Sequence, residues 1–327
     1  MKANTAKDKV LLLLKGSSDY ISGEELSQRM GITRSAIWKY IKSLRDEGYQ
    51  IDSVTNKGYK LVDSNNVLNA IELEEGLQTK NLGKKIIFLQ SVDSTNQEVK
   101  RQAVNDAPHG TVVVAEQQFM GKGRLGRMWS SPPGTGIWFS FLLRPQITPS
   151  EIAGITLAAG LGVCKAIRQF TGLNALIKWP NDVIVGNKKI CGILTEMTAE
   201  DDRVEYAVVG IGINVNMTEF APEIRNKATS IAVETGSPIN RADLFKVVLK
   251  WVEYYIDMYL TDIEKSIIPE YTSLCATVGR QVTVTRGNNI LRGNAVSVDS
   301  LGDLNVKLEN GKIIAVNSGE VTVQGIY

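Results

Sequence analysis

Apolar residues near the N-terminal end of the chain recur at helical spacing three times before the pattern changes. The spacing predicts helices near residues 10–14, 22–30 and 33–48, and a Ser-Gly-Glu-Glu capping sequence opens the second. Alternating residues then predict a two-stranded ribbon over 49–54 and 59–62. Three short helices closed by a ribbon indicate a winged helix-turn-helix domain.

The third predicted helix carries a basic face. We expect Ile37, Trp38 and Ile41 to face inward, and a tight turn at Gly31 precedes the helix, as in proteins whose second motif helix enters the major groove. The residues predicted to contact DNA are Arg34 and Ser35 at the helix start, Lys39 and Lys42 along it, and Lys57 at the ribbon tip, with Arg45 as a further phosphate contact. A solvated basic helix in a protein-interaction module is the alternative.

The rest of the chain predicts two further parts. Helical and strand patterns mix from residue 67 onward, whereas the last part consists of short β-runs separated by Gly and Asn turns. The fold class is therefore α+β and multidomain. We expect a winged helix-turn-helix at 1–64, a mixed α/β domain at 67–272 and a small β-barrel at 273–327.

Composition narrows the possible functions. Lys plus Arg (37) nearly balance Asp plus Glu (35), but residues 1–62 hold 11 basic and 7 acidic side chains, a local net charge of +4. Positive charge is thus concentrated where DNA would bind. Three scattered cysteines and one histidine leave little material for a disulfide framework, a zinc cluster or a histidine triad. We expect a cytoplasmic protein that does not bind membranes, because we find neither a signal sequence nor an apolar run of about 18 residues.

A glycine-rich loop offers three cations. The run from Gly121 to Gly126 matches G-x-G-x-x-G, but the Arg-Met-Trp-Ser-Ser-Pro-Pro sequence after it cannot begin the helix that a dinucleotide fold requires. Lys122, Arg124 and Arg127 on a flexible backbone instead suit a polyphosphate or phosphate ester, and we expect the loop to order over a bound ligand. A surface hairpin with solvated charges is the alternative.

A second group of polar residues lies further along the chain. Lys178-Trp-Pro-Asn-Asp182 precedes a strand, and Lys189 begins the next apolar run. Two glycines at alternate positions, Gly210 and Gly212, share one face of a later strand, and this bare face is predicted to take a flat ring. Each feature alone is more often structural, but their joint presence favours a binding site.

Five motifs together resemble one family. Asp-Ser-Thr-Asn at 93–96, the loop at 121–127, Lys-Trp-Pro-Asn-Asp at 178–182, Lys-Ile-Cys-Gly-Ile-Leu at 189–194 and Gly-Ile-Gly-Ile-Asn at 210–214 are similar to those of bifunctional biotin–protein ligases that repress biotin operons. The similarity extends over essentially the whole chain. It implies a central domain like that of class II tRNA synthetases and a C-terminal SH3-like barrel.

The resemblance also implies residue roles. Implied biotin contacts are Ser94, Thr95, Asn96, Gln118, Lys122, Gly123, Arg124, Lys189 and Gly192. Implied nucleotide contacts are Gly121, Arg127, Trp129, Asn181 and Asn214. Lys189, Arg124 and Arg127 are the expected catalytic cations, and Mg²⁺ would arrive with ATP near Asn181 and Asp182 rather than in a protein cluster. Lys122 stands where the family usually has arginine, so bidentate geometry is lost there.

The implied activity has two steps. Biotin and ATP give biotinyl-5′-adenylate, and the biotinyl group is then transferred to a lysine of a biotin carboxyl carrier protein, such as the biotin domain of acetyl-CoA or pyruvate carboxylase. The adenylate-bound protein would form a homodimer on operator DNA and repress transcription. Two alternatives are a lipoate or octanoate ligase and a biotin-sensing repressor without catalysis. A lipoate or octanoate ligase would differ in the acid that drives ATP–pyrophosphate exchange. A repressor without catalysis would not transfer biotin to a carrier domain.

Overall fold

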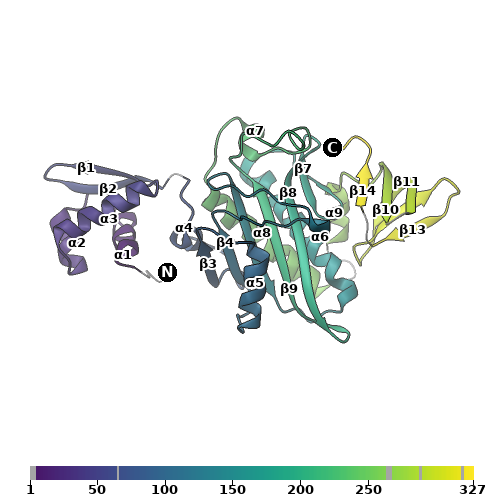
Figure 1. Ribbon diagram of the computed structural model, residues 1–327, viewed down its shortest axis with the longest axis horizontal. Helices are drawn as coiled ribbons and strands as arrows, with labels where there is room; N and C mark the ends of the chain where they lie inside the picture. The colour runs from purple at the N-terminus through teal and green to yellow at the C-terminus, as the bar shows by residue number, and fades with distance from the viewer. Residues whose placement is uncertain (1–4, 65, 263–266, 287–288, 318–319) are drawn as a thin grey trace. The chain divides into compact units, whose positions relative to one another are not determined.

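The computed structural model describes residues 5–64, 66–262 and 267–327, apart from 287–288 and 318–319. It divides into two compact units (Figure 1). Unit 1 comprises residues 1–76 and 240–243, and unit 2 comprises 77–239 and 244–327. The mixed α/β part and the C-terminal β-rich part, which the sequence separates at 272, thus share one unit.

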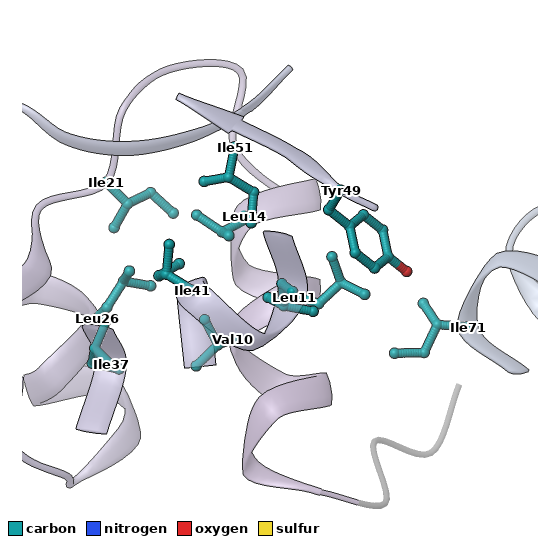
Figure 2. Close-up of a cluster of buried hydrophobic side chains, with 11 residues drawn as sticks. Val10, Leu11, Leu14, Ile21, Leu26, Ile37, Ile41, Tyr49, Ile51 and Ile71 are labelled. Atoms are coloured by element: carbon teal, nitrogen blue, oxygen red, sulfur yellow. The ribbon is translucent and has the colours of Figure 1, made fainter. Parts of the chain in front are cut away.

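Unit 1 is a three-helix domain with a β-ribbon. Its elements are α1 (Ala6–Lys15), α2 (Gly23–Met30), α3 (Arg34–Asp46), β1 (Gln50–Val54), β2 (Gly58–Asp63) and α4 (Ala70–Glu74). The antiparallel ribbon closes a core in which the side chains of α1, α2 and α3 meet those of the ribbon and α4 (Figure 2). This arrangement confirms the helix-turn-helix with a wing.

Local signals explain where the two motif helices begin and end. The Ser22 and Thr33 side chains accept hydrogen bonds from the Glu25 and Ala36 amides and so cap α2 and α3. Gly31 ends α2 with φ +64°, a left-handed conformation that glycine adopts without strain. The turn between the two helices therefore follows directly from the sequence.

One prediction about α3 is wrong. Trp38 is 55% exposed, because Ile37, Ile41 and Leu44 form the buried stripe and the position after Ile37 turns away from it. Arg45, which is exposed, donates to the Ile51 carbonyl at 2.6 and 2.9 Å, so its guanidinium also binds the ribbon, and its contact with phosphate stays a prediction.

A seven-stranded mixed sheet organises the central part of unit 2. Its strands are β3 (Lys85–Leu89), β4 (Thr111–Ala115), β5 (Gly136–Leu143), β6 (Leu176–Lys178), β7 (Asp182–Val185), β8 (Lys188–Glu200) and β9 (Arg203–Asn214). The spatial order is β3-β4-β5-β9-β8-β7-β6. Only β3 and β4 pair in parallel among these described strands.

Helices cover both faces of this sheet. The apolar residues of α5 (Thr95–Val104) pack with Leu142 of β5, whereas Phe139 of β5 meets Phe245 of α8 (Arg241–Thr261) at 5.2 Å between ring centroids. On the α8 side lies α6 (Ile152–Thr171), which follows a 3₁₀ turn at Pro149–Glu151. Side chains of β5 thus pack alternately against the helices on the two faces of the sheet.

The α6 helix and its preceding turn form one described segment long and apolar enough to cross a membrane by length and composition. Within the fold, however, 67% of that apolar window is buried. Its backbone comes so close to α8 that a Cβ on Gly162 would lie 2.6 Å from the Cα of Val252. A core helix against a sheet has the same composition, which explains its apolar run.

The C-terminal part is an antiparallel sheet. Its strands are β10 (Gln281–Arg286), β11 (Asn289–Val298), β12 (Leu304–Leu308), β13 (Ile313–Val316) and β14 (Glu320–Val323), in the order β13-β12-β11-β10-β14. Two further helices of unit 2 are α7 (Ile231–Thr235) and α9 (Ile268–Leu274). Trp179 binds this part, donating through Nε1 to the Gly302 carbonyl at 2.9 Å.

Candidate functional site

One cavity of about 520 Å³ gathers the motifs of the central domain. A volume in this range suits a small organic ligand. The predicted ligand residues that line it are Ser94, Thr95, Asn96, Gln118, Lys122, Gly123, Arg124, Arg127, Trp129, Asn181, Lys189, Gly192 and Asn214. The remaining one, Gly121, lies outside the lining: its carbonyl accepts from the Trp129 amide at 2.9 Å and closes the base of the loop.

Glycines on two neighbouring strands form a flat floor. Gly192 of β8 pairs directly with Gly212 of β9, and both line the cavity. The indole of Trp129 lies on this floor, because a Cβ on Gly212 would be 2.5 Å from Trp129 Nε1. The face predicted to be bare for a ligand ring is therefore covered by a side chain of the protein itself.

Asn96 covers the other glycine of that face. A Cβ on Gly210 would lie 2.1 Å from Asn96 Oδ1. The Asn96 amide donates to Glu196 at 2.8 Å, and its oxygen accepts from the Ser140 hydroxyl at 2.6 Å. Asn96 thus ties α5 to three strands while it lines the cavity.

Gln118 and Thr95 are held in the same network. The Gln118 side-chain oxygen accepts from the Thr95 amide at 2.8 Å, and its Nε2 donates to the Ser131 hydroxyl at 2.8 Å. Ser94, at the N-terminal end of α5, makes no side-chain capping bond and is 3% exposed. The start of α5 is therefore held by Gln118, which is itself bound to Ser131.

An ion pair holds the segment before α5. Arg101 donates to both Asp93 carboxylate oxygens, at 2.8 and 3.0 Å, and this contact lowers the pKa of Asp93 to about 2. The same carboxylate accepts from the Ser94 amide at 2.7 Å. Asp93 thereby links the helix surface to the first cavity residue.

We predict that Arg101→Met weakens the fold less at pH 3 than at pH 7. A lowered carboxyl pKa contributes stability above the unfolded value of about 3.9 and loses it as pH falls toward 2. Because the pair is partly exposed, the loss at pH 7 should be about 0.5–1 kcal/mol. Urea unfolding at pH 7 and pH 3 measures it, with exposed Arg203→Met as control. An equal loss at both pH values would contradict this role of Asp93.

The glycine-rich loop at 121–127 forms a short hairpin. The Gly123 amide donates to the Arg127 carbonyl at 2.8 Å, and Leu125 at the tip has φ +56°. From this hairpin the Arg124 guanidinium donates to the side-chain oxygen of Asn181 at 3.1 Å. The loop and the Lys-Trp-Pro-Asn-Asp turn, separate in sequence, thus meet across the cavity.

Lys189 lines the same cavity beside Asp182 and Trp129. Its Nζ is 2.5 Å from Asp182 Oδ1 and 5.2 Å from the centroid of the Trp129 ring. A carboxylate and an aromatic face both favour an ammonium at this position. Arg124 and Lys189 therefore bring positive charge to one cavity from two stretches of chain.

Three residues at or near the cavity were not predicted from the sequence as site residues. One is Glu196, which binds Asn96 of α5. Burial raises the pKa of Glu196, but hydrogen bonds from Lys100 and Asn96 outweigh burial and lower that pKa. Lys178 lines the cavity at 8% exposure, and its place at the head of the conspicuous Lys-Trp-Pro-Asn-Asp motif was a usable signal. Tyr327 also lines the cavity, and no sequence pattern indicates a site role for that residue.

Across the described part of the chain, no group of three His, Cys, Asp or Glu side chains is arranged to hold a metal ion. Asp182 is the acidic residue among the described lining residues. One carboxylate together with substrate phosphates is a common arrangement for Mg²⁺. Both oxygens of Asp182 already contact protein groups, Oδ1 the Lys189 ammonium and Oδ2 the Tyr327 hydroxyl, so this carboxylate does not offer an open ligand position.

In unit 1 the predicted DNA contacts form an exposed surface. Arg34, Ser35, Lys39, Lys42 and Lys57 are all exposed. Lys42 Nζ lies 5.8 Å from the centroid of the exposed Trp38 ring, and Lys57 lies 5.9 Å from that of Tyr20. The start and outer face of α3 and the ribbon tip thus carry the polar groups that a helix-turn-helix uses.

Comparison with known proteins agrees with this organisation. Three family models match in order: "HTH domain" over residues 6–60, "Biotin/lipoate A/B protein ligase family" over 88–214 and "Biotin protein ligase C terminal domain" over 277–323. The Bacillus subtilis "Bifunctional ligase/repressor BirA" is 36% identical over 313 residues, covering 95% of this chain and 96% of that protein. The chain belongs to the bifunctional biotin ligase/repressor family.

Other relatives extend this assignment. The Escherichia coli "Bifunctional ligase/repressor BirA" is 28% identical and aligns over 99% of both chains. A solved structure of biotin protein ligase from Aquifex aeolicus, in complex with biotin and ATP, is 33% identical with a TM-score of 0.65, covering 74% of this chain and 99% of that one. The chain is thus a ligase of the biotin type that carries a repressor's helix-turn-helix domain.

Proposed function

We propose that this protein joins biotin to ATP in the cavity of unit 2 and passes the biotinyl group to a carrier-protein lysine. The observation that carries the proposal is the arrangement of Arg124 and Lys189 around one cavity with an apolar, glycine-lined floor. Homology to ligases whose solved relative binds biotin and ATP supports the choice of substrates. A carboxylate and a triphosphate repel each other, so their reaction needs cations from the protein.

The first step forms a mixed anhydride. A biotin carboxylate oxygen attacks the α-phosphorus of ATP, and the bond to the bridging oxygen breaks to release pyrophosphate. In our proposal Lys189 stabilises the charge that develops on the α-phosphate, and Arg124 and Arg127 hold phosphate oxygens from the loop. Mg²⁺ that arrives bound to ATP would neutralise part of the phosphate charge.

The second step consumes the anhydride. The neutral ε-amine of the carrier lysine attacks the biotinyl carbonyl carbon, AMP leaves, and the amine loses its proton. This chemistry requires no nucleophile from the protein. The chain's three cysteines are all buried, and burial raises the pKa of Cys191 and Cys164 above the ordinary thiol value.

The direct test uses biotin, Mg-ATP and a biotin carboxyl carrier domain. We expect the carrier to gain the mass of one biotinyl group, and biotin but not lipoate or octanoate to drive ATP–pyrophosphate exchange. Exchange driven by lipoate instead would contradict the choice of acid. Absence of both exchange and transfer would leave a sensing repressor without catalysis.

We also propose that the adenylate-bound protein forms a homodimer that binds a two-fold operator through unit 1, in the cytoplasm. The exposed basic surface of α3 and the ribbon tip supports DNA binding, and the repressor relatives support its regulation. Ligand favours the dimer only by binding it more tightly than the monomer. Analytical ultracentrifugation with and without biotin and ATP tests this, and an unchanged monomer would contradict it.

The hairpin gives a sharper prediction about retention of the intermediate. Arg124→Gly should raise the rate at which biotinyl-5′-adenylate leaves the enzyme by about tenfold or more, because one charged hydrogen bond to phosphate is lost. Filtration of enzyme with radiolabelled adenylate measures the release.

Leu125→Gly is the matched control for that variant. Leu125 is 73% exposed and has φ +56°, so glycine there adds loop freedom without removing charge. Near-normal retention by Leu125→Gly is expected. Equal release from both variants would assign the effect to loop flexibility and contradict the role of the Arg124 guanidinium.

A further inference from the structure

Tyr327 brings the C-terminal β-rich part into contact with the cavity charges. Its hydroxyl donates to Asp182 Oδ2 at 2.5 Å, while Asp182 Oδ1 lies 2.5 Å from Lys189 Nζ. The Tyr327 ring also packs on Lys178, whose Nζ lies 3.7 Å from the ring centroid. The C-terminal end of the chain accordingly reaches β7 in Figure 1.

The carboxylate of Asp182 is thus shared between a donor and a cation. A hydrogen bond on one oxygen fixes the plane of the carboxylate, and therefore fixes where the other oxygen holds an ammonium. Burial first, and then the Asp182 charge, raise the pKa of Tyr327, so the phenol keeps the proton that it donates.

The surroundings make this contact specific. The Ala276 amide donates to the Ile177 carbonyl at 2.8 Å, and the Trp179 amide donates to the Thr277 hydroxyl at 3.0 Å. These bonds hold the segment before β10 against the Lys-Trp-Pro-Asn-Asp turn on both sides of Lys178. Tyr327 therefore approaches Asp182 from a part of the chain that is attached to the same turn.

We propose that Tyr327 is a positioning residue for adenylation, which orients Asp182 and through it Lys189. The inference rests on the proposed function, because Lys189 matters only if a negatively charged phosphate forms beside it. It goes beyond that function because it gives the C-terminal β-rich part a role in the reaction, in which the last described side chain sets the position of a catalytic cation. Tyr327 itself need not touch substrate.

The test is a double-mutant cycle between Tyr327→Phe and Asp182→Asn. Phenylalanine keeps the ring over Lys178 and removes only the hydroxyl. We expect Tyr327→Phe to lower kcat for biotin-dependent pyrophosphate exchange about three- to tenfold while KM for biotin changes less than twofold, since one hydrogen bond that acts through a neighbour is lost. In an Asp182→Asn background the same change should have almost no further effect.

Two outcomes would overturn the proposal. Full activity of Tyr327→Phe is one, and equal fold-losses from Tyr327→Phe in the wild-type and Asp182→Asn backgrounds are the other. Tyr254→Phe is the control, because that ring is 50% exposed and lies on α8 among aromatic neighbours. It should leave kcat unchanged.

A readout without catalysis separates this inference from the proposed function. The decrease in Tm caused by Tyr327→Phe should be smaller in the Asp182→Asn background, whatever reaction the protein performs. If the two substitutions are coupled in Tm but the protein shows no biotin-dependent exchange, the proposed function is refuted while the contact between Tyr327 and Asp182 stands. Exchange in the wild type without coupling in either measurement would refute the positioning role alone.

Discussion

Lys189→Met should reduce biotin-dependent ATP–pyrophosphate exchange by about a hundredfold or more, the usual consequence of removing one group that stabilises charge in a transition state. Methionine keeps most of the apolar stem and removes the ammonium beside Asp182 and Trp129. Biotin affinity should fall much less than kcat, because the charge that Lys189 meets is largest during the reaction.

Lys188→Met provides the matched control, since the neighbouring side chain of β8 does not line the cavity. It should retain near-normal exchange. Isothermal titration with biotin alone separates binding from chemistry. Exchange by Lys189→Met within twofold of wild type would remove this lysine from the mechanism.

Glu253→Ala should lower the free energy of unfolding of unit 2 by about 2–4 kcal/mol, because it leaves one buried and two partly buried amide donors without their acceptor. The Glu253 carboxylate of α8 is 6% exposed and accepts from the backbone amides of Lys80, Asn81 and Leu82 at 2.6, 2.6 and 2.8 Å. This side chain fixes the segment that leads into β3.

Urea unfolding followed by circular dichroism measures the loss. Lys250→Met on the same helix is the control, because its 3.0 Å hydrogen bond to Gln78 is exposed and should contribute less than about 0.5 kcal/mol. Glu253→Gln should fall between the two, since it keeps an acceptor and loses the charge. A loss below about 1 kcal/mol in Glu253→Ala would contradict this role.

Local sequence signals predicted the fold well where they act over a few residues. The three N-terminal helices and the ribbon lie where the sequence predicts them, since capping and turn residues flank each short apolar run. Trp38 was misplaced because its hydrophobicity suggested burial, whereas the helical stripe through Ile37 and Ile41 decides which positions face the core.

The sequence allowed many residues of the candidate site to be named, but it did not show which residues they contact. Motif residues such as Arg124 and Lys189 could be named because cations and glycines cluster in recognisable runs, and they do line one cavity. Their partners depend on distant chain segments. Glu196 bonds Asn96 across 100 positions and Tyr327 reaches Asp182 across 145, and no local pattern encodes either pairing.

The glycine floor has a thermodynamic consequence. The Trp129 indole already shields Gly192 and Gly212 from water, so a ring that came to rest there would have to displace it. Entry would exchange one apolar contact for another, and the surface removed from solvent would be only the difference between them. The heat-capacity change on binding should accordingly be smaller in magnitude than the area of the incoming ring suggests.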